Sequence, residues 1–151
     1  MKTLGNILWH IPFCGFVTAI TVYLLGLILM ATVVAAPIGL GLMELGKFLF
    51  FPFGHAMVSK TDLKVEQNAA WGAYSKIVMI LYFPIGLCLA IVAMVQIACL
   101  FFTIVGIPPA LVLAKSLGTY LNPVNKKCVH SAVVDELERQ KARAEVSKHV
   151  R

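Results

Sequence analysis

Charged residues are scarce in this sequence, and two long stretches have none at all. Of its 151 residues, 13% are charged and 60% are hydrophobic, whereas soluble domains carry about 25% charged residues. Asp, Glu, Lys and Arg are missing from residues 3–43 and again from residues 77–114. Each stretch exceeds the roughly 20 apolar residues that a helix needs to cross a bilayer. The pattern excludes an ordinary soluble domain and predicts a multi-pass membrane protein.

The sequence also lacks the patterns that usually mark a catalytic or metal site. Its four cysteines, Cys14, Cys88, Cys99 and Cys128, form no CxxC pair, and its four histidines have no metal-ligand spacing. It shows no Ser–His–Asp arrangement, phosphate loop or paired carboxylates. We therefore predict a protein that is not an enzyme and takes no cofactor or metal. Its formal charge of +6 fits the bias of Lys and Arg toward cytoplasmic segments, without nucleic acid as a partner.

The two uncharged stretches resemble each other when the chain is shifted by 71 residues. Comparing residues 5–54 with residues 76–125 gives ten identities without a gap. They include a glycine pair, Gly15 and Gly86, and two proline pairs, Pro37 with Pro108 and Pro52 with Pro123. Repeated units of this kind are common in membrane proteins. The offset predicts a duplicated unit.

Each unit contains the same parts in the same order. A long apolar helix is expected over residues 13–36 and 85–107, and a shorter one over residues 38–51 and 109–122. Proline is tolerated in the first turn of a helix but breaks a helix interior, so Pro37 and Pro108 are expected to start the shorter helices. Pro52 and Pro123 are expected to end them. One long helix with a kink at the proline is the alternative.

The fold class that follows is an all-α membrane protein with two repeated units and a cytoplasmic C-terminal helix. The predicted organisation is unit one at residues 1–54, a polar central loop at 55–75, unit two at 76–125, and a basic, helical tail at 126–151. Basic residues follow both units, which places both following segments in the cytoplasm if each unit enters the membrane and returns. The amino end would then be cytoplasmic as well. A single crossing per unit, giving an inverted repeat, is the alternative.

Few polar residues lie within or beside the apolar stretches, and these are the candidates for a site. Glu44 and Lys47 are three residues apart and should share a helix face. Lys115, Thr119 and Asn122 form a second stripe at helical spacing, and Gln96 lies deep in the second long helix. Glu44 and Lys115 are equivalent under the offset, so they could meet between the units. Such residues either line a polar path or, in the simpler interpretation, snorkel to water and bridge helices.

Aromatic residues near the starts of the apolar stretches suit a membrane-interface belt. Trp9, Tyr74 and Tyr82 are in such positions. We expect their rings to lie at the level of the lipid headgroups.

Several short motifs are spread along nearly the whole chain: GNILW at residues 5–9, ELGK at 44–47, PFG at 52–54, and VGIP at 105–108. Lys115, Pro123 and Lys126–Lys127 follow the last of these. With these motifs the chain resembles the YccF family of bacterial inner-membrane proteins. The resemblance implies a repeated inner-membrane component domain and an inner-membrane location, and it brings no activity, substrate or catalytic residue. The chain differs in having Pro109 beside Pro108 and no glycine after the second proline.

Two functions follow as expectations from these features. The first is a non-enzymatic integral membrane protein that forms a homo-oligomer or binds a membrane protein partner within the lipid bilayer. The second is a small channel or transporter with a path near the proline-broken helices.

Overall fold

The computed structural model describes residues 2–11, 13–63 and 69–149, and it is mostly helical, as the sequence predicts. The elements in chain order are α1 (Lys2–His10), α2 (Gly15–Ala31), α3 (Ala36–Phe50), β1 (His55–Ser59), α4 (Ala69–Phe101), a short 3₁₀ helix η1 (Ile104–Gly106), α5 (Ile107–Leu121), β2 (Lys126–His130) and α6 (Ser131–His149).

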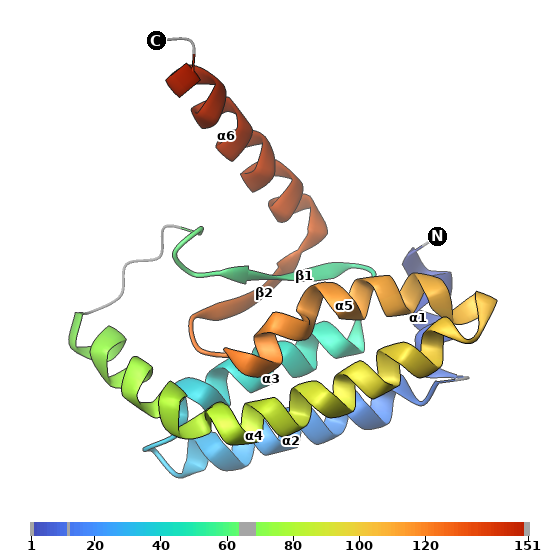
Figure 1. The fold of residues 1–151 in the computed structure, drawn as a ribbon, viewed down its shortest axis with the longest axis horizontal. Helices are drawn as coiled ribbons and strands as arrows, with labels where there is room; N and C mark the ends of the chain where they lie inside the picture. The colour runs from blue at the N-terminus through green and yellow to red at the C-terminus, as the bar shows by residue number, and fades with distance from the viewer. Residues whose placement is uncertain (1, 12, 64–68, 150–151) are drawn as a thin grey trace.

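The helices form two antiparallel pairs, α2 with α3 and α4 with α5 (Figure 1). Pro37 lies in the first turn of α3 and Pro108 in the first turn of α5, where a missing N–H breaks no helical hydrogen bond. The second long helix begins earlier than the predicted residue 85, because Pro84 lies inside α4 and does not end it. That helix runs for 33 residues.

Glycine lets α2 and α3 approach closely. A Cβ atom on Gly39 would lie 2.5 Å from the backbone nitrogen of Met30, and one on Gly26 would lie 2.8 Å from the carbonyl oxygen of Gly39. Small residues at helix contacts of this kind are typical of packing in membranes. The pair is therefore joined along its length by backbone contact.

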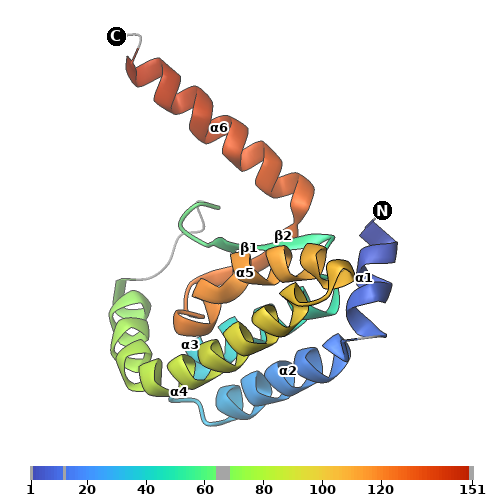
Figure 2. The same cartoon turned by 45° about the vertical axis from the view of Figure 1, so that its right-hand side comes forward.

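A two-stranded antiparallel sheet, which the predicted all-α class did not include, covers the helices. β1 pairs with β2 in a register that sets His55 opposite His130 and Ser59 opposite Lys126. The sheet lies over α3 and α5, and these lie over α2 and α4 (Figures 1 and 2). From β2 the chain continues directly into α6, which rises away from the rest of the molecule.

The outer surface of the helices is strongly apolar. α4 buries one narrow stripe against its neighbours and exposes the rest, including Ile77, Ile80, Leu81, Phe83, Ile85, Leu87, Ile91, Val92, Met94, Val95 and Phe101. Two segments of the described chain, α4 and Ile104–Leu121, are long and apolar enough to cross a membrane. The α1–α2 pair would qualify as one further span, with a bend of 83°.

Two of the three aromatic residues expected at a membrane interface are instead buried in the protein. Trp9 is 0% exposed and Tyr82 is 2% exposed. The indole N–H of Trp9 donates to the carbonyl of Leu49 at 2.9 Å, and the Tyr82 hydroxyl donates to the carbonyl of Tyr120 at 3.2 Å. Each ring therefore joins two helices, and the interface assignment of Trp9 and Tyr82 was wrong.

Candidate functional site

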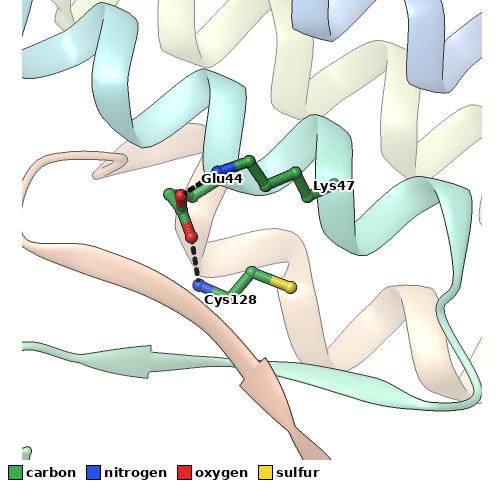
Figure 3. Close-up of polar contacts among 3 residues, drawn as sticks. All are labelled: Glu44, Lys47 and Cys128. Atoms are coloured by element: carbon green, nitrogen blue, oxygen red, sulfur yellow. Dashed lines mark hydrogen bonds and ion pairs between the residues drawn. The ribbon is translucent and has the colours of Figure 1, made fainter.

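Glu44 is the centre of a polar contact between the helices and the sheet. It lies in α3, and its Oε1 atom forms an ion pair with Lys47 Nζ at 2.5 Å. Its Oε2 atom accepts a hydrogen bond from the backbone N–H of Cys128 in β2 at 2.9 Å (Figure 3). The Glu44 side chain is 20% exposed and that of Lys47 is 53% exposed. Glu44 thus fastens β2 to α3, while Lys47 reaches the surface.

A cleft of about 340 Å³ adjoins this contact. Besides Glu44, Lys47 and Cys128, it is lined by Phe50, Phe51, His55 and Lys127. The rings of His55 and His130 meet edge to face across the sheet, with centroids 5.7 Å apart. The cleft therefore combines two lysines and a histidine with apolar walls.

The thiol of Cys128 is a poor nucleophile in this setting. Burial raises its pKa to about 11, with the Glu44 carboxylate acting in the same direction and Lys47 opposing it. Because the thiolate is the reactive form, little of Cys128 is reactive near neutral pH. Among the residues that the structure describes, no three His, Cys, Asp or Glu side chains gather as a metal site requires.

The remaining candidate residues lie on other elements and do not join Glu44. Lys115 and Asn122 are exposed at the two ends of their predicted stripe, whereas Thr119 between them is 3% exposed. Gln96 donates from Nε2 to Thr18 Oγ1 at 3.2 Å, which links α4 to α2. Neither ion pair found among the described residues includes Lys115.

The prolines of the candidate set occupy matching places. Pro37 and Pro108 start α3 and α5, and Pro52 and Pro123 are buried between those helices and the strands. The carbonyl oxygen of Pro123 lies against Gly41 of α3, where a Cβ atom would approach it to 2.0 Å. The second proline of one half therefore packs directly on a helix of the other.

The sequence did not predict that the GNILW motif joins α1 to the end of α3, although it forms the main contact of α1. Trp9 and His10 bond to the carbonyls of Leu49 and Phe50 at the end of α3, at 2.9 and 2.8 Å. The Oδ1 atom of Asn6 accepts from the backbone N–H of Phe53 at 3.2 Å. The last carbonyls of a helix have no partner within it, so α1 supplies partners for the end of α3.

Removing the Glu44 carboxylate should weaken the attachment of the sheet. We expect Glu44→Ala to lower the free energy of unfolding by about 1–3 kcal/mol, because the N–H of Cys128 loses its acceptor. The matched variant Lys47→Met should change it by no more than about 1 kcal/mol, since an exposed ion pair contributes little. Unfolding in detergent micelles, followed by circular dichroism, measures both. Equal losses in the two variants would contradict a role for Glu44 in holding β2.

Comparison with known families identifies the first part of the chain. Residues 4–55 match the family model YccF, described as an inner membrane component domain, which confirms the resemblance for this part of the chain. The match covers roughly a third of the chain, from α1 to the start of β1. No curated protein and no solved structure matches the chain.

Proposed function

We propose that this chain is an integral inner-membrane protein that functions by associating with other membrane proteins. The match to a YccF inner membrane component domain and the helices apolar enough for a bilayer support this proposal. Its partner is a second copy of itself or another membrane protein, and the assembly surface is the sheet with α6. The observation that carries the proposal is α6, a 19-residue helix with no buried residue that projects from the body (Figure 1).

An isolated helix of this kind needs a surface to rest on. α6 is longer than the roughly 12–15 residues below which an isolated helix is marginal in water, but most helical stability in proteins comes from packing of an apolar face, and α6 has no buried residue. α6 touches the body near the sheet and through an ion pair between Lys141 and Asp62 at 2.8 Å. Leu137 and Ala144 line an open cleft of about 420 Å³ between α6 and residues 61–63. The cleft combines apolar side chains with polar ones, including Gln140 and Asp62, and could accept a partner there.

The proposed duplication is supported by the bounds of the elements. A shift of 71 residues carries α3 (Ala36–Phe50) onto α5 (Ile107–Leu121), and β1 (His55–Ser59) onto β2 (Lys126–His130), residue for residue. In the sheet, Met57 pairs with Cys128, which is its own equivalent under the shift. A two-fold rotation exchanges the two members of such a pair, so the two units would be related by an axis that passes between Met57 and Cys128, through the middle of the sheet.

The proposed topology places the amino end, the central loop and the C-terminal tail in the cytoplasm. The pairing of β1 with β2 supports it, because the segments after both units must then lie on one side. The lysines of these segments, Lys60, Lys126 and Lys127, agree with the bias toward the cytoplasm.

We also propose that the protein is not an enzyme and that nucleic acid is not its partner. The polar candidates act in the structure as connections between elements: Glu44 holds β2, and Gln96 holds α2. The Cys128 thiol is held in its less reactive form.

A channel or transporter is the second candidate, favoured by a groove between α2 and α4. The groove, of about 200 Å³, is lined by Thr18, Thr21 and Gln96 among apolar side chains. Solute flux into liposomes that contain the native protein, together with its loss in the Gln96→Leu variant, would establish this function. Equal flux through protein-containing and empty liposomes would exclude it.

Photo-crosslinking on α6 tests the assembly proposal. A benzophenone amino acid at Ala144, which lines the cleft, should form protein adducts of one discrete mass in native membranes. Ala142 is the matched control, because it has the same side chain and lies two residues away, on the other side of the helix. We expect at least a severalfold lower yield from position 142. No protein adducts from either position, with a strictly monomeric purified protein, would overturn the proposal.

A further inference from the structure

The two helical pairs point in opposite directions beneath one sheet. The turn from α2 to α3 and the turn from α4 to α5 lie at opposite ends of the molecule, and the sheet lies flat over both pairs (Figures 1 and 2). The three layers are therefore the sheet, then α3 with α5, then α2 with α4. Because the three layers pack into one body, the position of one layer in a membrane fixes the positions of the other two.

Polar and apolar surfaces separate along the direction in which these layers stack. Besides Lys2 at the start of α1, the charged residues of the described body lie in the sheet and the turn that follows β1 (Lys126, Lys127, Lys60 and Asp62), in α3 (Glu44 and Lys47), in α5 (Lys115) and in α4 (Lys76). The lowest layer has none in α2 and none in α4 after Lys76. Lys76 belongs to the first turns of α4, which rise toward the level of the sheet in Figure 1.

An orientation in which the long helices cross the bilayer conflicts with this layering. The sheet runs alongside the helices, so crossing helices would carry it to bilayer depth. Apart from the N–H of Cys128, which donates to Glu44, the outer edges of the two strands pair with no further strand among the described residues. These edges and the side chains of Lys126 and Lys127 would then face hydrocarbon. Lipid-exposed sheet edges do not occur in bilayers, because each unpaired backbone group costs several kcal/mol, and each central lysine costs about 3 kcal/mol or more.

We propose that the body lies within one leaflet, with α2 and α4 running roughly along the plane of the membrane. The acyl chains cover α2, α4 and both turns, and the sheet lies at the cytoplasmic surface with α6 in water. The inference rests on the proposed cytoplasmic position of the sheet and α6. It replaces the full crossings expected from the sequence. It also accounts for the length of α4, whose 33 residues span about 50 Å, against about 30 Å of hydrocarbon.

The turn between α2 and α3 has the properties expected of a segment that lies in lipid. Val33 and Val34 are 75% and 61% exposed, so the turn shows apolar side chains to its surroundings. All five backbone N–H groups from Thr32 to Ala36 donate within the chain, that of Ala35 to the Thr32 hydroxyl. The same hydroxyl donates to the carbonyl of Leu29 at 2.6 Å. A turn whose donors are satisfied internally needs no water.

The second turn uses the equivalent threonine in the same way. The Thr103 hydroxyl donates to the carbonyl of Leu100 at 3.0 Å and accepts from the N–H of Gly106 at 3.1 Å. These three residues lie 71 positions after Leu29, Thr32 and Ala35. Phe102 and Ile104 are 90% and 87% exposed at this turn. Both turns thus combine an internally bonded threonine with exposed apolar side chains.

Nitroxide depth measurements along α4 test the orientation. In a variant with the four native cysteines replaced by alanine, single labels are placed at Leu87, Met94 and Phe101, which are spaced by seven residues and similarly exposed (41–48%). The full chain is reconstituted in liposomes, and depth is read from collisions with oxygen and a water-soluble nickel chelate. If α4 lies in one leaflet, we expect the three depths to differ by less than half of the about 21 Å that separates the outer two along the helix.

A depth difference close to that full separation, or a Phe101 label open to the nickel chelate, would overturn the inference. A label at Glu138 in α6 is the aqueous reference. Cysteine at Val33 gives a second measurement: a membrane-impermeant maleimide should label it neither from the outside of cells nor in inverted vesicles. Labelling of Glu138→Cys from outside would instead refute the proposed cytoplasmic placement, so the two failures can be told apart.

Discussion

Trp9→Ala is expected to destabilise the protein more than any other single truncation in α1. Trp9 is 0% exposed, and Gly15 at the start of α2 lies so close that a Cβ atom there would approach the indole to 2.1 Å. Its N–H also holds the carbonyl of Leu49 at the end of α3. One side chain thus joins three helices. Truncating a buried aromatic residue costs about 3–5 kcal/mol, and here a helix-end carbonyl loses its partner as well.

Two controls separate the contributions of Trp9. Trp9→Phe keeps most of the ring but lacks the N–H, so it should recover a large part of the loss and leave the cost of one hydrogen bond, about 1–3 kcal/mol with the carbonyl unpaired. Leu4→Ala, at a side chain that is 71% exposed in the same helix, should change stability by less than about 0.5 kcal/mol. Unfolding by SDS in mixed micelles gives all three values. A Trp9→Ala protein as stable as Leu4→Ala would show that α1 does not dock as described.

The membrane class could be predicted because it depends on composition over long windows. The charge-free stretches at residues 3–43 and 77–114 contain α2, most of α4 and the first part of each shorter helix. The two strands could not be predicted in the same way. Each has five residues, and HAMVS and KKCVH show no alternation of apolar and polar residues. They pair across a separation of some 70 residues. Local propensity depends on neighbouring residues, so it does not predict such a pairing.

Tyr82 and Trp9 show where a compositional rule failed. An aromatic residue with a polar tip suits a membrane interface, but it equally suits a buried site with a hydrogen-bond acceptor. The acceptors here are carbonyls of Leu49 and Tyr120, which lie 40 and 38 residues away. Only the tertiary fold brings them within reach. Tyr74, by contrast, is 36% exposed, and its hydroxyl donates to the carbonyl of Val34.

In the candidate site, too, the contact between neighbours in sequence could be predicted and the long-range contact could not. Glu44 and Lys47 could be placed on one face because three residues span nearly a full helical turn. The hydrogen bond that the N–H of Cys128 donates to Glu44 joins residues 84 positions apart, and no pattern in the sequence predicts it. The expected meeting of Glu44 with Lys115 depended on the symmetry of the units, but a lysine at the equivalent position cannot accept the bond that Glu44 accepts. The two residues therefore differ in role as well as in charge.

Gly41→Ala should disrupt the contact between the two halves of the molecule. A Cβ atom on Gly41 would lie 2.0 Å from the carbonyl oxygen of Pro123 and 2.5 Å from its carbonyl carbon. These are backbone atoms, held in place by the buried Pro123 before β2, so no flexible side chain can move aside. Overpacking of this kind costs about 1–3 kcal/mol or more. That loss must outweigh the gain of about 1 kcal/mol that alanine brings to a helix interior in place of glycine.

Gly118→Ala is the matched control for this substitution. Gly118 also lies inside a helix, α5, but a Cβ atom there meets nothing within 4 Å. The same change should therefore raise stability by about 0.5–1 kcal/mol, through helix propensity alone. The two variants thus share their chemistry and differ in the sign of the effect, which thermal unfolding in detergent resolves directly. If both variants gained stability, Pro123 and β2 would not rest on α3, and the halves could not be joined as the sheet requires. A loss in Gly41→Ala alone would locate the joint between the halves at the second proline, where the shorter helix of one unit meets the strand of the other.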